Sequence, residues 1–74
     1  MVTIKWDGKV HTGETFEDVL TKIEKDPWVG SRHEIAKRVE KHYGKPVKFK
    51  TAKEFFERLE ELGELTIVER EELQ

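Results

Sequence analysis

Residues 1–13, MVTIKWDGKVHTG, predict a β-hairpin, and the rest of the fold follows from it. Residues that favour strands lie on both sides of Asp7-Gly8, and an Asp-Gly pair between two such runs is typical of a tight turn. Glycine also adopts the left-handed backbone conformation that closes short hairpin loops. We therefore expect the chain to start with two antiparallel strands within residues 2–12.

The alternation of apolar residues predicts the register of this hairpin. A three-residue loop, residues 6–8, pairs Ile4 with Val10 and keeps both on the same buried face as Val2. A two-residue loop would place Val10 opposite Lys5, on the other face of the sheet. Because the first arrangement buries all three apolar side chains, we expect the three-residue loop.

Three helices are expected between the hairpin and the C-terminus. Each begins with Ser or Thr followed three positions later by an acidic residue, the spacing of a capping box. Each then repeats apolar residues every three or four positions, which predicts one buried stripe. The helices are expected at about residues 16–25, 32–43 and 52–62, after the caps Thr15, Ser31 and Thr51.

The sequence LTIV at residues 65–68 predicts a final strand that joins the hairpin. Residues 45–50 alternate apolar and basic side chains, so this segment is expected to be extended, with a short edge strand as one option. Residues 69–74 form a charged tail, for which a last helical turn is an option. The predicted fold class is α+β, with the N-terminal β-hairpin and the C-terminal strand in one small antiparallel sheet, packed against three helices.

The size and composition of the chain restrict it to a single domain, residues 1–74. The chain is 35% hydrophobic and 41% charged, which leaves too few apolar residues for a second core. No apolar run approaches the roughly 20 residues of a membrane-spanning helix. Cysteine is absent, which excludes disulfides, thiolate metal sites and cysteine nucleophiles. We expect a soluble protein without a membrane partner, and cytoplasmic localisation is the default.

Several residue types are nearly missing from the sequence. Asn is absent, and Ser, Gln and Met each occur once. Depletion of such thermolabile or weakly structure-forming residues, together with many Glu and Lys, is typical of thermophilic proteins and of designed ones. Both origins stay open, and either predicts a thermostable protein.

Charge is segregated along the chain, although the net charge is only −2. Residues 27–53 carry eight basic against two acidic residues, whereas residues 54–74 carry two basic against eight acidic. A basic block is the electrostatic footprint of a protein that binds nucleic-acid phosphates. Ion pairing between the basic second helix and the acidic third helix is the competing interpretation. The candidate nucleic-acid contacts are Arg32, Lys37, Arg38, Lys41, Lys45, Lys48, Lys50 and Lys53.

Residues 31–68 also carry a family pattern. The runs EIAKRV at 34–39, FFERLEELG at 55–63 and LTIV at 65–68 resemble those of winged helix-turn-helix DNA-binding domains. The resemblance implies a first helix, a recognition helix, a wing strand and DNA binding. The run at 55–63 is rich in Glu, however, and acidic side chains are repelled by DNA. The second helix and the loop after it are therefore the better nucleic-acid candidates.

Two tryptophans, Trp6 and Trp28, fall in predicted loops. A loop tryptophan either folds back over the core as a lid or stays exposed as a binding anchor. If both were exposed and adjacent, they would form an apolar patch suited to a protein partner. Trp6 and Trp28 are therefore the candidate protein-contact anchors.

Catalytic chemistry finds little support in the sequence. His11, His33 and His42 lack the spacing of zinc ligands, and the glycines do not form a phosphate-binding loop. Ser31 and Thr51 are explained as helix caps. We expect no enzyme activity, no catalytic residue, no cofactor and no metal. The predicted function is a small binding or interaction module whose partner, if it has one, is a protein, with nucleic-acid binding through residues 32–53 as the alternative.

Overall fold

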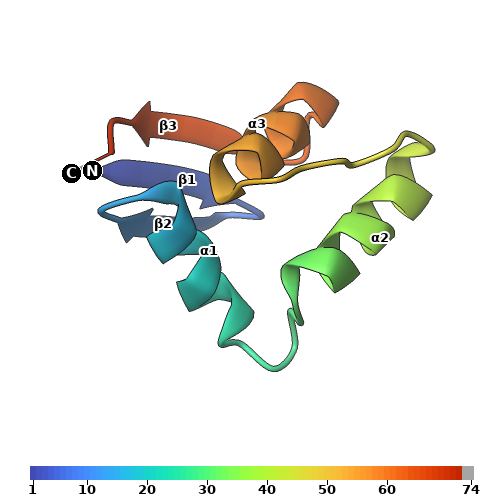
Figure 1. Ribbon diagram of the computed structural model, residues 1–74, viewed down its shortest axis with the longest axis horizontal. Coiled ribbons are helices and arrows are strands. Elements are labelled where there is room, and N and C mark those ends of the chain that lie inside the picture. The colour runs from blue at the N-terminus through green and yellow to red at the C-terminus, as the bar shows by residue number, and fades with distance from the viewer. Residues whose placement is uncertain (73–74) are drawn as a thin grey trace.

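The computed structural model describes residues 1–72 and contains one antiparallel sheet and three helices (Figure 1). The sheet has the strand order β2-β1-β3, so the C-terminal strand joins the hairpin, and the predicted α+β fold class is confirmed. The strands are β1 (Val2–Trp6), β2 (Lys9–Gly13) and β3 (Thr66–Arg70), and the helices are α1 (Phe16–Glu24), α2 (Arg32–Tyr43) and α3 (Ala52–Leu62).

The hairpin register differs from the predicted one. Asp7 and Gly8 have φ values of 51° and 78°, so they form a two-residue turn in which both central residues are left-handed. Lys5 therefore pairs with Val10, and the predicted pairing of Ile4 with Val10 is wrong. The physical reason is that the left-handed Asp-Gly turn matches the twist of the strands, and this outweighs the burial of one valine. Val10 is 63% exposed as a result.

Glycine at the end of β2 allows α1 to approach the sheet closely. Gly13 pairs with Val2 and is buried. A Cβ atom at this position would lie 3.0 Å from Val19 Cγ2 and 3.1 Å from Asp18 Cβ, both in the first turns of α1. The helix begins three residues after Gly13, where the Thr15 side chain accepts a hydrogen bond from the Asp18 amide. A larger residue than glycine would separate α1 from the sheet.

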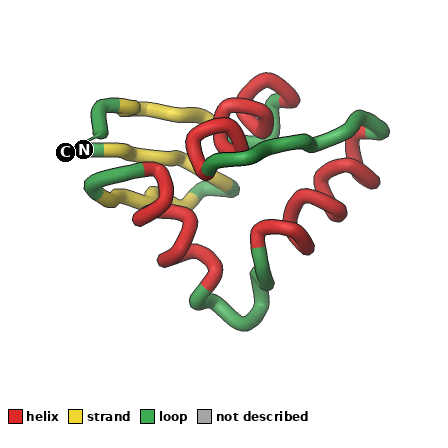
Figure 2. Tube along the Cα trace, viewed as in Figure 1, coloured by secondary structure: helices red, strands yellow, loops and turns green. Residues whose placement is uncertain are grey.

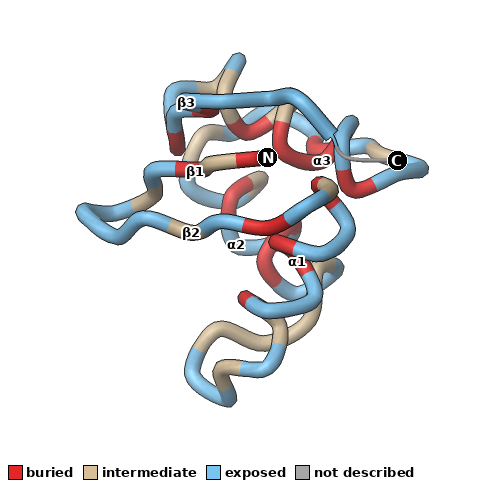
Figure 3. The backbone as a smooth tube through the Cα atoms, turned by 90° about the vertical axis from the view of Figure 1, so that its left-hand side faces the viewer, coloured by how far each residue is buried: buried red, intermediate tan, exposed pale blue. Residues whose placement is uncertain are grey.

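The helices cover one face of the sheet, and the core lies between the two layers. Aromatic rings pack within the helical layer and against the loop before α3, with centroid separations of 6.0 Å for Phe16–Phe56, 5.4 Å for Phe55–Phe56 and 4.9 Å for Phe49–Phe55. Figure 3 shows that buried positions gather where the strands and helices face each other. The other face of the sheet is open to solvent, and Val10 and Val68 are exposed there.

Residues 45–50 run as a loop from the end of α2 to the start of α3 (Figure 2), and the optional edge strand is not formed. The segment is nevertheless tied to the body. Val47 is buried, its amide donates to Glu40 Oε1 over 3.0 Å, and Phe49 packs against the core. The hydrogen bond between the Val47 amide and Glu40 and the packing of Phe49 therefore hold this segment against the helices.

The third strand is longer than predicted. It extends to Arg70 rather than ending at residue 68, so the start of the expected charged tail belongs to the sheet. The optional last helical turn is absent from residues 69–72, and residues 73–74 lie outside the described part of the chain. Glu60 of α3 accepts hydrogen bonds from the Ile67 amide and from Arg70, and these bonds lower its pKa.

The register predicts different costs for two valines of the hairpin. Val2 is completely buried, so Val2→Ala should lower the free energy of unfolding by about 1.5–3 kcal/mol. Val10→Ala, a matched change at an exposed position, should cost about 0.5 kcal/mol or less. Denaturant unfolding of the two variants measures both values. Equal losses would contradict the two-residue turn and support the three-residue loop.

Candidate functional site

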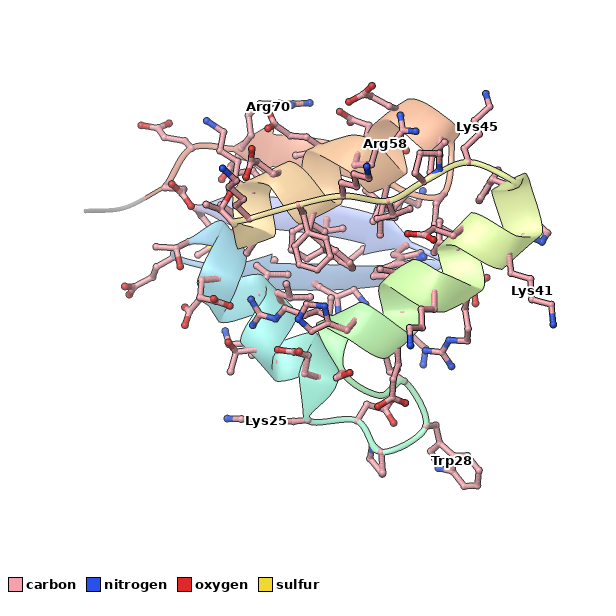
Figure 4. All side chains as sticks on the ribbon, turned by 45° about the vertical axis from the view of Figure 1, so that its right-hand side comes forward. Lys25, Trp28, Lys41, Lys45, Arg58 and Arg70 are labelled. Carbon is pink, nitrogen blue, oxygen red and sulfur yellow. The ribbon has the colours of Figure 1, made fainter. Side chains whose placement is uncertain are left out.

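A short turn between α1 and α2 presents Trp28 to solvent. The Trp28 amide donates to Asp26 Oδ1 over 3.0 Å, and the Val29 amide donates to the Asp26 carbonyl over 3.0 Å. The guanidinium of Arg38, which lies in α2, donates to the Val29 carbonyl. Figure 4 shows the indole of Trp28 pointing away from the body of the protein. Trp28 is 91% exposed, on a turn that these hydrogen bonds hold.

Arg32 fastens the first residue of α2 to α1. Its guanidinium donates to both carboxylate oxygens of Glu17, over 2.9 and 2.6 Å, and to those of Glu24, over 3.1 and 2.7 Å. The Arg32 amide also donates to Glu24 over 2.8 Å. These hydrogen bonds lower the pKa values of both Glu17 and Glu24 and raise the pKa of Arg32. Arg32, a predicted nucleic-acid contact, is thus used inside the fold.

A groove of about 600 Å³ lies between the end of the hairpin, the last turn of α1, the Trp28 turn and α2. The side chains of Ile23, Ile35 and Val39, each almost fully buried, form its apolar floor. The volume is within the range of small binding sites, about 300–1,000 Å³. The groove is lined by Trp6, Asp7, Lys9, His11, Lys22, Ile23, Asp26, Trp28, Val29, Ile35, Arg38, Val39, His42 and Glu64.

The two predicted anchors line the same groove but differ in their environments. Trp6 is half-buried and packs against the core, and its Nε1 donates to Glu64 Oε2 over 3.0 Å. The Tyr43 hydroxyl donates to the other oxygen of Glu64 over 2.9 Å, which raises the pKa of Tyr43. Trp6 therefore lies over the core as a lid, whereas Trp28 is exposed to solvent. The pattern of the sequence around Glu64 gave no signal that it would join the hairpin to α2.

Two histidines line the groove, and the third lies elsewhere. Partial burial and the neighbouring Lys9 lower the pKa of His11, which favours the neutral form of this imidazole. His42 contacts Tyr43 edge to face at 4.8 Å between ring centroids. His33 stacks on Phe49 at 5.5 Å. Within residues 1–72, no group of three or more His, Asp or Glu side chains is arranged to hold a metal ion.

Seven of the eight predicted nucleic-acid contacts are exposed and form no ion pair with any residue from 1 to 72; Arg32 is the exception. Two acidic residues of α3 pair with arginines outside this set: Glu60 with Arg70 at 3.1 Å and Glu61 with Arg58 at 3.6 Å. Figure 4 shows Lys41 and Lys45 extending away from the protein. The seven exposed cations are Lys37, Arg38, Lys41, Lys45, Lys48, Lys50 and Lys53.

Comparisons with protein-family models, with curated proteins and with solved structures found no match for this chain. Over residues 1–72, none of the helices has the length and apolar character needed to cross a membrane. The groove, the exposed indole of Trp28 and the seven exposed cations are the features that bear on function.

The pairing of Arg32 with Glu17 and Glu24 predicts an acid-sensitive contribution to stability. Because the pKa values of both carboxyls are lowered from 4.5, their contribution is complete above that pH and is lost as the pH falls through the folded-state values. Arg32→Met should therefore lower the free energy of unfolding by about 1 kcal/mol at neutral pH and by little at about pH 2.5. Denaturant unfolding across this range measures the difference.

Arg70→Met is the matched control, because Arg70 pairs with a carboxylate on another part of the surface. It should leave the pH dependence that comes from Glu17 and Glu24 in place. If Arg32→Met lowers stability equally at neutral and acidic pH, the loss comes from packing and the ion-pair account is contradicted.

Proposed function

We propose that this chain is a non-catalytic interaction module that binds a protein partner through the groove and Trp28. The observation that carries the proposal is a tryptophan 91% exposed at the rim of a groove with an apolar floor. Tryptophan is enriched among the residues that dominate binding energy at protein interfaces. Burying the indole of Trp28 against a partner would remove a large apolar surface from water.

The rigidity of the Trp28 turn supports this proposal. Hydrogen bonds from the amides of Trp28 and Val29 and from Arg38 hold the turn, and Pro27 restricts its backbone further. A side chain presented on an ordered turn loses less conformational entropy on binding than one on a mobile loop. The position of the indole is therefore suited to act as a preorganised anchor.

The polar groups around the groove also favour binding over catalysis. The carboxylates of Asp26 and Glu64 already accept hydrogen bonds from Trp28, Trp6 and Tyr43. These hydrogen bonds fix both carboxylates within the fold and leave fewer of their lone pairs for a substrate. Their use within the fold supports a structural role for both residues.

Nucleic-acid binding is the second candidate function. It is favoured by one observation, the seven exposed cations on α2 and the following residues that form no ion pair within residues 1–72. Each Lys or Arg that neutralises a phosphate releases counterions and so adds to affinity. The resemblance to winged helix-turn-helix domains stays a prediction that points in the same direction.

The protein-binding proposal predicts a strong dependence on Trp28. Peptides selected from a displayed random library on the wild-type protein should bind Trp28→Ala about 30-fold more weakly, the loss typical of an interface hot spot. Titration by fluorescence anisotropy measures the affinities. Val68→Ala, which removes an exposed apolar side chain from the open face of the sheet, should leave them unchanged. Selected peptides that bind Trp28→Ala as tightly as the wild type would contradict the proposal.

The nucleic-acid candidate predicts binding that depends on charge and salt. A mobility shift with a DNA duplex and with a single strand should appear at about 50 mM salt and weaken steeply as salt is raised. Lys37→Glu combined with Lys41→Glu should reduce affinity about tenfold or more, whereas Lys5→Glu, on the open face of the sheet, should have a much smaller effect. No shift at low salt, or equal effects of these variants, would remove this function.

A further inference from the structure

An aromatic stack lies at the surface where the start of α2 meets the loop before α3. The ring of His33 is nearly parallel to that of Phe49, with 28° between the planes and 5.5 Å between the centroids. Phe49 is half-buried and packs edge to face on the fully buried Phe55, at 4.9 Å. His33 is exposed, so the face of its ring that is turned away from Phe49 is open to solvent. The fold thus presents a flat ring on a fixed support.

Basic residues flank this stack on both of the elements that form it. Lys37 follows His33 by four positions in α2, the spacing of neighbouring side chains on a helix surface. In the loop, Lys48 and Lys50 are exposed on either side of Phe49, whose ring packs against the core. A ligand lying on the His33 ring would therefore meet cations from α2 and from the loop.

The charge of this region is unequal, unlike that of the groove. The groove is lined by as many Asp and Glu as Lys and Arg. Residues 33–53 instead carry seven basic and two acidic residues. Of the two acids, Glu34 accepts a hydrogen bond from the Ser31 hydroxyl, and Glu40 accepts one from a loop amide. Such an excess of cations is suited to a ligand that carries several phosphates.

Carboxylates of the neighbouring helices are partly used within the fold. Glu17 and Glu24 of α1 both pair with the arginine at the start of α2. On α3, Glu54 accepts hydrogen bonds from the amides of the two residues before the helix, over 3.0 and 3.1 Å. With Glu54 and Glu57 included, residues 33–57 still carry seven basic against four acidic residues. The excess of cations around the stack therefore remains.

We propose that this surface binds single-stranded nucleic acid through an unpaired base stacked on His33. The phosphates on either side of that base interact with Lys37 of α2 and with Lys48 and Lys50 of the loop. Every base has a flat π face, so stacking on an aromatic ring adds affinity without selecting a sequence. The bases of a duplex are stacked on one another and leave the His33 ring without a partner. This inference rests on nucleic-acid binding, the second candidate function, and involves neither the groove nor Trp28.

The test compares ligands that share their phosphates and differ in their bases. A fluorescent strand of about twelve deoxythymidines should bind, at about 50 mM salt, at least about fivefold more tightly than an abasic strand of the same length. Fluorescence anisotropy measures both affinities. A strand of uridines distinguishes RNA from DNA, and tighter binding of either strand supports the proposal and identifies the preferred sugar.

Variants of His33 separate stacking from charge, and because His33 is exposed they should fold. His33→Ala should weaken binding of the thymidine strand about tenfold and leave the abasic strand unchanged, since only the base loses its partner. His33→Phe, which keeps a flat ring and carries no charge, should bind as the wild type does. His33→Lys, which keeps a positive charge and has no ring, should bind as weakly as His33→Ala.

His42→Ala is the matched control. His42 is also an exposed histidine of α2, but it contacts Tyr43 edge to face and lines the groove, so its loss should leave both affinities unchanged. NMR gives a direct readout, because a base stacked on His33 should shift the proton signals of that ring upfield and those of His42 far less.

Four outcomes overturn the stacking. Equal affinities for the thymidine and abasic strands show that phosphates alone bind, and the nucleic-acid candidate then stands without the stack. Loss of affinity in His33→Ala that His33→Lys restores assigns the effect to charge. Tighter binding of a duplex than of either single strand identifies the duplex as the ligand. Absence of binding to all strands at low salt removes the nucleic-acid candidate together with this inference.

Discussion

The turn at Asp7 and Gly8 is the constraint on which the hairpin and the groove depend. Both residues are left-handed, so the loop between the first strands has two residues and the register of the hairpin follows. This register directs Trp6, Lys9 and His11 toward the helices and turns Val10 to the open face. One turn thus determines which side chains of the hairpin line the groove.

The placement of α2 depends on a second set of interactions, which are polar. Arg32 ties its first residue to Glu17 and Glu24, while Glu64 joins Tyr43 near its end to Trp6. Between these two points, Ile35 and Val39 face the core, and the groove opens beside them. The helix is therefore held at both ends, and the hollow between them is bordered by fixed groups. Such a border favours binding of a partner without rearrangement of the module.

The helices could be predicted from the sequence because their signals are local. Thr15, Ser31 and Thr51 each cap a helix as expected, and the expected bounds differ from the observed ones by at most one residue. The predicted register of the hairpin is wrong because the preference of Asp-Gly for a two-residue turn outweighs the burial of Val10. The turn determines the register, because a left-handed Asp-Gly turn matches the twist of the strands that it joins.

The candidate site was harder to predict because it depends on contacts between distant residues. Both Trp6 and Trp28 fall in predicted loops, and the sequence does not show that Trp6 bonds to Glu64, 58 residues away, whereas Trp28 stays exposed. The sequence also does not decide whether the basic residues 27–53 pair with the acidic third helix, because it does not show that Glu60 and Glu61 pair with Arg70 and Arg58. Only Arg32 of that block is used in an ion pair within residues 1–72.

The register of the hairpin is tested most directly by cross-strand proton contacts in the free protein. In an antiparallel pair, the Cα atoms of non-hydrogen-bonded partners approach to about 4.5 Å, so their Hα protons give strong nuclear Overhauser effects. The account predicts such effects between Lys5 and Val10 and between Thr3 and Thr12. Strong effects between Ile4 and Val10 instead would show a three-residue loop and contradict the groove described above.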